Sequence, residues 1–276
     1  APFRAGRAEL TALAGRLADR DAKRALVGTA CQALTPLHEK LRPAILRPMW
    51  NQDLWEEYFV FHFPPGSPLT PDAALADAAW LAGLLRLEDQ PLSDQETAEA
   101  VRLTLRYGGR DLFVPDWAAG VLLDDEQECT ETLQVIEFAN LQFLEYRHID
   151  DRLDGNLARA SELIERAGRS RLPFWHGSEA PLRVLGQLRV EATGLFERTG
   201  NVLKLVGDPY LARVYGLLAE RFHLREWERS IQRKLDVIEG VYQVVSDQTA
   251  AFRTESLEVI VIVLIVVEIL LALFHR

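Results

Sequence analysis

The strongest hydrophobic pattern in this sequence lies at its C-terminal end. A charged, amphipathic helix pattern begins near Leu224 and runs without a break into eighteen almost wholly apolar residues, Leu257–Phe274. At about 1.5 Å per residue, this run spans about 27 Å as a helix, slightly less than the roughly 30 Å hydrocarbon core of a bilayer. The pattern predicts a globular body carried on a C-terminal transmembrane anchor. A helix buried in a large core or an oligomer is the alternative.

Two carboxylates interrupt the apolar run. Glu258 lies near its edge, whereas Glu268 lies deeper, where a charged group costs on the order of 3 kcal/mol. The apolar residues together favour insertion by roughly 5 to 9 kcal/mol, which exceeds the cost of the two carboxylates by a small margin. A lone span offers Glu268 no partner, and we therefore expect the anchors to associate through a stripe of Val261, Leu264, Glu268 and Ala272. A snorkelling or locally hydrated carboxyl in a monomer is the alternative.

A heptad-like stripe precedes the apolar run. Its members are spaced alternately by four and three residues: Ile231, Leu235, Ile238, Tyr242, Val245, Thr249, Phe252 and Ser256. A strict two-in-seven stripe is typical of a coiled coil, while a wider one belongs to a helix lying on its own domain. Val237, Val241 and Val244 widen the first half. We interpret the first half as packed on the protein itself and the second half as a stalk.

The first half of the sequence mixes helix and strand signals. Leu10, Leu13 and Leu17 mark a short helix, whereas Ala25–Leu34 is ambiguous. The aromatic, β-branched run Tyr58–Phe63 ends at two prolines, as a buried strand does.

Further along, Thr70 and Pro71 form the start of one helix, whose buried face consists of Leu75, Ala79, Ala82 and Leu85. Ser93–Glu96 fits a capping box for a short helix. Alternation over Val101–Tyr107 predicts a strand, joined through a Gly108-Gly109 hairpin loop to Asp111–Val114. These elements predict a small, mostly antiparallel sheet with helices.

The second half is predicted to be helical. The expected helices cover Asp124–Ala167, with a break or kink near Gly155, then Val184–Val206, Tyr210–Arg221 and the C-terminal helix. Asp208 and Pro209 supply the cap and first turn of the third. We expect an α+β protein with three parts: an α+β domain over residues 1–123, a long-helix antiparallel bundle and stalk over 124–256, and the anchor over 257–274.

The long helix carries the best candidate for a binding site. Residues at three- and four-residue spacing place Glu137, Asn140, Leu144, Arg147, Asp151 and Asp154 on one face. This polar stripe would face a partner or a cleft; a solvated face with ion pairs such as Arg147–Asp151 is the other interpretation.

Trp175, in a loop bounded by Pro and Gly, is a candidate partner anchor, although a core tryptophan fits the pattern equally well. No catalytic motif, metal-ligand spacing or cofactor-binding loop appears, so we expect neither a cofactor nor a metal.

Composition and charge narrow the classes of partner. The chain has 276 residues, of which 48% are hydrophobic and 26% charged, which is ordinary for a folded protein. Its net charge of −10 disfavours nonspecific binding to nucleic acid. Cys31 and Cys129 form no disulfide framework, and no apolar leader opens the sequence, so we expect the body on the cytoplasmic side of the membrane.

Several stretches resemble a known family. They are Tyr58–Phe63, Arg106–Leu123 (RYGGRDLFVPDWAAGVLL), Glu137–Leu153 (EFANLQFLEYRHIDDRL), Asn201–Tyr215 (NVLKLVGDPYLARVY), Trp227–Leu235 (WERSIQRKL) and Arg253–Ile269 (RTESLEVIVIVLIVVEI). On these, the chain resembles the family called required for meiotic nuclear division protein 1 homolog, also known as Sad1-interacting factor or domain of unknown function 155.

The resemblance implies a membrane-associated homo-oligomer without established enzymatic activity, whose eukaryotic members support translation by the mitochondrial ribosome. Since no mitochondrial presequence is present, it implies a bacterial member, in the inner membrane.

The expected function is therefore that of a membrane-anchored, homo-oligomeric scaffold. By family analogy, such a scaffold would tether translation machinery or another complex, with a protein or ribosome as partner. A membrane-bound hydrolase that uses the polar stripe from Glu137 to Asp154 is the alternative from a different class. An enzyme would need that stripe to face a concave pocket with perturbed carboxylates, whereas a scaffold would show it on a flat or intersubunit surface.

Overall fold

The computed structural model describes residues 5–46, 54–124, 126–169, 186–187, 190, 193 and 208–274. Within these ranges, the side chains at 126–128, 160, 163–169, 245, 248–253, 255–256 and 272 lie outside the description. The chain divides into two compact units. Unit 1 comprises Ala1–Glu145 and Leu203–Arg225, and unit 2 comprises Tyr146–Val202 and Glu226–Arg276. Each unit is described by itself.

Unit 1 begins with two helices. Helix α1, Arg7–Ala18, confirms the prediction made from its leucines, and it buries Leu10 and Ala14. Asp19 ends α1 and caps α2, Arg20–Leu41, by accepting hydrogen bonds from the backbone N–H groups of Asp21 and Ala22. The segment left ambiguous by the sequence is thus helical. A short 3₁₀ helix, η1 (Arg42–Ala44), follows.

The predicted helix after Thr70 is present but divided. Thr70 Oγ1 accepts from the N–H of Ala73 and caps α3, Pro71–Ala76. Asp77 then interrupts the helix and caps α4, Ala78–Arg86, by accepting from the N–H of Trp80. Because each cap satisfies backbone donors at a helix start, two short helices replace the single one that the pattern predicted. Ser93 caps α5, Asp94–Ala100, in the same way.

The sheet is small, as predicted, but its strands and their pairing differ from the prediction. It consists of β1 (Phe59–Phe63), β2 (Leu112–Pro115) and β3 (Ala119–Leu123), in the order β1-β3-β2. Strand β3 pairs parallel with β1 and antiparallel with β2, so the sheet is mixed rather than mostly antiparallel.

The prediction of a strand over Val101–Tyr107 is wrong. Only Leu105 forms an isolated bridge, to Phe113. The carboxylate of Asp111 accepts from the backbone N–H groups of Tyr107 and Gly108, which closes a loop where a two-residue hairpin was expected.

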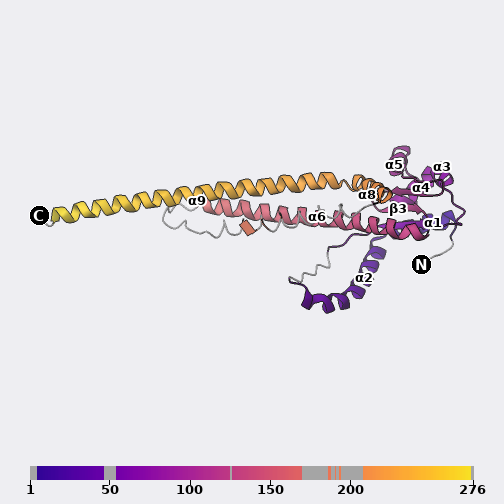
Figure 1. Cartoon of the computed structure of the whole chain (residues 1–276), viewed down its shortest axis with the longest axis horizontal. Coiled ribbons are helices and arrows are strands. Elements are labelled where there is room, and N and C mark those ends of the chain that lie inside the picture. Colours follow the sequence, from indigo (N-terminus) through magenta and orange to yellow (C-terminus); the bar gives the residue numbers. More distant parts are fainter. Residues whose placement is uncertain are drawn as a thin grey trace. The chain divides into compact units, whose positions relative to one another are not determined.

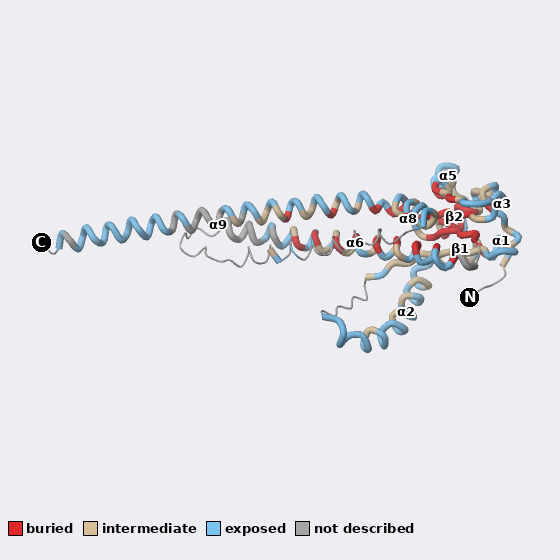
Figure 2. The backbone as a smooth tube through the Cα atoms, in the orientation of Figure 1, coloured by how far each residue is buried: buried red, intermediate tan, exposed pale blue. Residues whose placement is uncertain are grey.

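The core of unit 1 lies on this sheet. Strands β2 and β3 are buried along their whole length, and α4 packs on them with Leu81, Leu84 and Leu85 fully buried. Figure 2 shows this concentration of buried backbone around the strands. Gly120 lets Tyr58 approach β3 closely, because a Cβ at this position would lie 2.8 Å from the Tyr58 hydroxyl oxygen. A side chain there would force the tyrosine ring to move.

The first part of α6 (Glu126–Arg169) and α8 (Pro209–Arg221) complete unit 1. Asp208 caps α8 as predicted, accepting from the N–H groups of Tyr210 and Leu211. Aromatic rings join the two helices: Phe143 stacks on Phe222, with centroids 5.4 Å apart. Trp117, between β2 and β3, packs against both rings.

In unit 2, the remaining part of α6 packs along α9, Leu224–Phe274. Buried residues of α6 recur at three- and four-residue spacing (Tyr146, Ile149, Leu153 and Asn156), and Ile231 and Ile238 are buried on α9. The first half of the heptad-like stripe thus packs on the protein itself, as predicted. It is narrower than expected, because Val237 and Val244 are more than half exposed.

Figure 1 shows α6 and α9 side by side in unit 2, running in the same direction. The helix predicted over Val184–Val206, which would run the other way between them, lies almost wholly outside the described residues, so the antiparallel bundle stays a prediction. Helix α6 shows no break at Gly155. Within the parts of the chain that the structure describes, no helix is long and apolar enough to cross a membrane, so the predicted transmembrane helix gains no support there.

Candidate functional site

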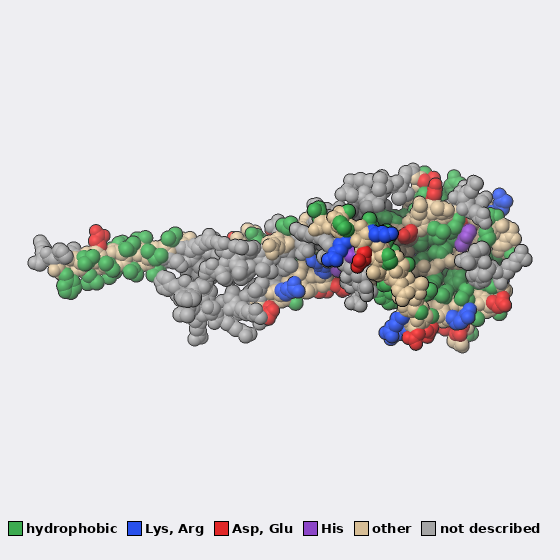
Figure 3. Space-filling view, turned by 90° about the horizontal axis from the view of Figure 1, so that it is seen from below, with side chains coloured by type: hydrophobic (Ala, Val, Ile, Leu, Met, Phe, Trp, Pro, Cys, Tyr) green, Lys and Arg blue, Asp and Glu red, His purple; other side chains and the backbone are tan. Residues whose placement is uncertain are grey.

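The C-terminal part of α9 exposes apolar side chains on every side. From Leu257 to Leu271, each Leu, Ile and Val is between 41% and 63% exposed. Figure 3 shows this end of the helix covered by hydrophobic side chains. Val261, Leu264 and Glu268 are exposed together on one stripe, as the spacing predicts, while the side chain of Ala272 lies outside the described residues. Among described residues, this is the longest exposed apolar surface.

The polar stripe on α6 divides between the two units. In unit 1, Glu137 is exposed, and the Asn140 side chain donates a hydrogen bond to the carbonyl oxygen of Ile136 at 2.9 Å. Asn140 therefore has a partner within its own helix. Leu144, the apolar member of the stripe, also lies in this unit and is partly buried.

In unit 2, Arg147 and Asp151 are exposed, whereas Asp154 forms a contact with α9. Lys234 Nζ lies 2.6 Å from Asp154 Oδ1 and 2.7 Å from Asp150 Oδ1. Burial alone would lower the pKa of Lys234, but the hydrogen bonds and charges of the two aspartates overcome this effect and raise it. Asp154 thus joins two helices. Trp175 lies outside the described residues.

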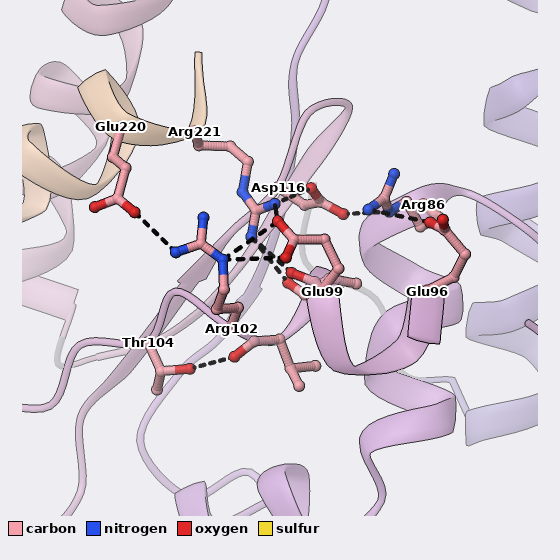
Figure 4. Close-up of polar contacts among 10 residues, drawn as sticks. Arg86, Glu96, Glu99, Arg102, Thr104, Asp116, Glu220 and Arg221 are labelled. Atoms are coloured by element: carbon pink, nitrogen blue, oxygen red, sulfur yellow. Dashed lines mark hydrogen bonds and ion pairs between the residues drawn. The ribbon is translucent and has the colours of Figure 1, made fainter. Parts of the chain in front are cut away.

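A buried ionic cluster in unit 1 was not found from the sequence. Its centre is Asp116, fully buried in the turn between β2 and β3. Arg86 Nε, at the end of α4, lies 2.6 Å from Asp116 Oδ2, and Arg221 Nη1, at the end of α8, lies 3.2 Å from Asp116 Oδ1. Figure 4 shows both guanidinium groups converging on this carboxylate. Arg221 is itself only 2% exposed.

The cluster continues outward to the surface. Arg221 Nη1 lies 3.1 Å from Glu99 Oε1, and its Nη2 donates to the backbone carbonyl oxygen of Glu99 at 3.0 Å. Arg102 then bridges the Glu99 carboxylate at 3.1 Å and Glu220 at 2.8 Å. The hydrogen bond from Arg102 lowers the pKa of Glu99. The cluster therefore links α4, α5, α8 and the β2–β3 turn.

Its buried end is imperfectly hydrogen-bonded. Four buried atoms lack a hydrogen bond of good geometry: both carboxylate oxygens of Asp116, Arg86 Nε and Arg221 Nε. The opposite charges nevertheless lie within ion-pair distance of one another. Burial raises the pKa of Asp116, against the opposing effect of Arg221 and Arg86. Burial also raises the pKa of the Tyr58 hydroxyl, and the charge of Asp116 adds to the shift.

These charges partner one another, so the arrangement fits a structural role better than a reactive one. Opposite charges in one buried cluster compensate for each other's loss of water, and they fix the elements that carry them. Among the described residues, no group of three or more His, Cys, Asp or Glu side chains is placed to hold a metal ion.

Comparisons with known proteins point to an archaeal relative. A family model described as the N-terminal domain of uncharacterized protein MJ0711 matches residues 1–130. Uncharacterized protein MJ0711 of Methanocaldococcus jannaschii is 27% identical to this chain over 226 residues, which cover 81% of this chain and 68% of that protein. No solved structure matches the chain.

These matches overturn the family resemblance drawn from the sequence. The match over residues 1–130 is to a different family, and the matching relative is archaeal, so the expectation of a bacterial member is wrong as well. Three of the six stretches that carried the resemblance lie in α6 and α9, and the described end of a fourth lies in α8. Long amphipathic helices share their periodicity across unrelated families. The expected link to translation depended on that resemblance and loses its basis with it.

Proposed function

We propose that this protein is a membrane-anchored, homo-oligomeric scaffold that acts by binding partners rather than by catalysis. The observation that carries the proposal is the exposure of apolar side chains on all sides of α9 beyond Leu257. A helix that is hydrophobic all round is stable only where lipid or protein covers it. Without such a cover, water would contact each of these side chains, and the free-energy cost would be roughly 25 cal/mol for each Å² of exposed apolar surface.

Length and composition favour lipid as the cover. The apolar run of the sequence extends from Leu257 to Phe274. Eighteen helical residues reach about 27 Å, close to the thickness of a hydrocarbon core. Carboxylates at only two positions leave the balance in favour of insertion.

The position of Glu268 favours association of the anchors. It lies eight residues from Arg276, or about 12 Å along a helix, too far for its carboxylate to reach the far interface easily. Facing a second copy, on the stripe with Val261 and Leu264, reduces the cost of placing this group in lipid. The anchor would therefore hold the chain in the membrane and bring copies together.

A binding role also fits the polar stripe better than hydrolysis does. The Asn140 amide bonds to its own helix, and Asp154 is engaged by Lys234. No disulfide joins Cys31 and Cys129, in keeping with a body on the cytoplasmic side, where disulfides are rare. The scaffold would present its body there to a protein partner.

The test compares the full chain with a version ending at Ser256. The full chain should pellet with membranes and resist carbonate extraction, while the shortened version should be released. Extraction of the full chain by carbonate would refute the anchor.

Oligomerisation is tested separately with Glu268→Leu in mild detergent. If Glu268 meets its counterpart, the variant should form fewer oligomers by mass photometry than the unmodified chain. An unchanged or tighter oligomer would refute this contact without affecting the anchor.

A further inference from the structure

A second exposed apolar surface lies in unit 1, on α2. None of the side chains of this 22-residue helix is buried. Leu26, Leu34, Leu37 and Leu41 are each between 48% and 52% exposed. Figure 2 shows α2 as exposed along nearly its whole length.

The leucines form one narrow stripe rather than a scattered set. At 100° per residue, these four leucines, with Ala30 and Ala33 between them, fall within an arc of about 100°. Gln32 and Glu39 lie on the opposite face, and both are exposed. Helix α2 is therefore amphipathic, with its apolar face uncovered. Ile45 and Leu46, 42% and 102% exposed, extend the apolar character beyond η1.

The charge of this segment is opposite in sign to that of the whole chain. From Arg20 to Arg42 there are five basic residues and two acidic ones, a net charge of +3 in a chain whose net charge is −10. The basic residues are Arg20, Lys23, Arg24, Lys40 and Arg42. Lys23 pairs with Glu57 at 2.5 Å. Arg20, Lys40 and Arg42 stand at the two ends of the leucine stripe.

We propose that α2 lies on an anionic lipid surface, with its leucine stripe in the interface and its basic residues against the headgroups. A one-sided apolar stripe with basic residues beside it is the pattern of helices that lie in the plane of a membrane surface. Lys and Arg near such a surface are attracted by anionic headgroups. A second copy of α2 fits less well, because pairing would bring two segments of charge +3 together.

This inference rests on the proposed membrane anchoring and adds a second, lipid-selective contact to it. The anchor would insert into a neutral or an anionic bilayer alike, whereas α2 would bind only where the headgroups are anionic. The two contacts can therefore fail separately, and one assay distinguishes them.

The experiment places an environment-sensitive fluorophore on the leucine stripe of the full chain, at Leu37→Cys, with Cys31 and Cys129 replaced by alanine. Gln32→Cys carries the same label on the opposite face as the matched control. Each chain is mixed with vesicles of phosphatidylcholine alone or with added phosphatidylglycerol, with and without quencher lipids. Flotation of the vesicles reports whether the chain is bound.

With phosphatidylglycerol, the label at position 37 should shift to the blue and be quenched from within the bilayer, while the label at 32 should not respond. Arg20→Glu combined with Lys40→Glu should weaken the response at 37 by about tenfold or more, since each basic residue contributes to the attraction. Circular dichroism on each variant checks that the fold is retained.

A label at 37 that ignores phosphatidylglycerol overturns the inference, and flotation with phosphatidylcholine then shows whether the anchor still holds. A blue shift that appears without lipid and grows with protein concentration would assign the stripe to a second copy instead. If the full chain does not float with phosphatidylcholine, the anchor has failed, and flotation with phosphatidylglycerol still tests α2 on its own.

Discussion

Replacing Arg221 by methionine tests whether the ionic cluster holds unit 1 together. The guanidinium is 2% exposed and faces the fully buried carboxylate of Asp116 at 3.2 Å. Methionine keeps most of the length of the side chain and removes its charge. Asp116 would then keep only Arg86 as a close partner, and the backbone carbonyls of Glu99 and Ala100 would lose their donor. Loss of one partner from a buried ion pair costs about 3 to 5 kcal/mol.

Arg102→Met is the matched control, because it removes the same group from the same cluster near the surface. Arg102 is 47% exposed, and its partners Glu99 and Glu220 are exposed to a similar degree. Water can replace those contacts, so the free energy of unfolding should fall by less than about 1 kcal/mol. Urea unfolding of the full chain in mild detergent, followed by circular dichroism, gives both values.

A double variant separates the effect of the unpaired charge from the effect of changed packing. Asp116→Asn in the Arg221→Met background removes the carboxylate left without Arg221, and it should recover part of the lost stability. Equal losses for Arg221→Met and Arg102→Met would refute the argument from burial. So would an Arg221→Met chain within about 0.5 kcal/mol of the unmodified protein.

Three further changes test other parts of the structure. Gly120→Ala should destabilise unit 1 by about 1 to 3 kcal/mol in urea, because its Cβ would lie 2.8 Å from the Tyr58 hydroxyl oxygen. Gly155→Ala in α6 meets open space, and it should instead stabilise by up to about 1 kcal/mol in the same assay. Lys234→Met should destabilise at neutral pH. The pKa of Lys234 is raised on folding, so the stability it contributes is complete below its usual value of 10.5 and is lost as the pH rises through the folded value. The gap between the two chains in thermal melts should therefore narrow above that pH, and a constant gap would contradict this pairing.

Local signals in the sequence predicted the elements whose stability is local. Thr70 and Asp208 cap their helices through backbone donors two or three residues away, so the pattern that reveals them needs no knowledge of the fold. The strand β1 and the continuous helix α9 were likewise visible from composition and period. In contrast, Asp77 divides a helix that its apolar spacing presents as continuous.

Long-range pairing explains what the sequence did not reveal. Strand β3 is a short apolar run with a glycine, and it becomes a strand by pairing parallel with β1, some sixty residues earlier in the chain. Alternation over Val101–Tyr107 favoured the wrong strand, since only Leu105 reaches the sheet. Asp116 and Arg221 lie 105 positions apart, in a turn and at a helix end. No spacing rule connects them, so the cluster becomes visible only when the sheet and α8 are placed.

The two uncovered apolar surfaces differ in a way that predicts different partners. The end of α9 is apolar around its whole circumference, so no orientation on a flat interface would shelter more than part of it. It needs a cover on all sides, as the bilayer interior provides. Helix α2 has a stripe about 100° wide beside basic residues, and burying it fully would desolvate those charges. An interface that is apolar on one side and anionic on the other satisfies both faces at once. If a protein partner covered α2 instead, its flanking lysines and arginines would oppose burial of the helix. Reversing their charge would then leave lipid binding unchanged.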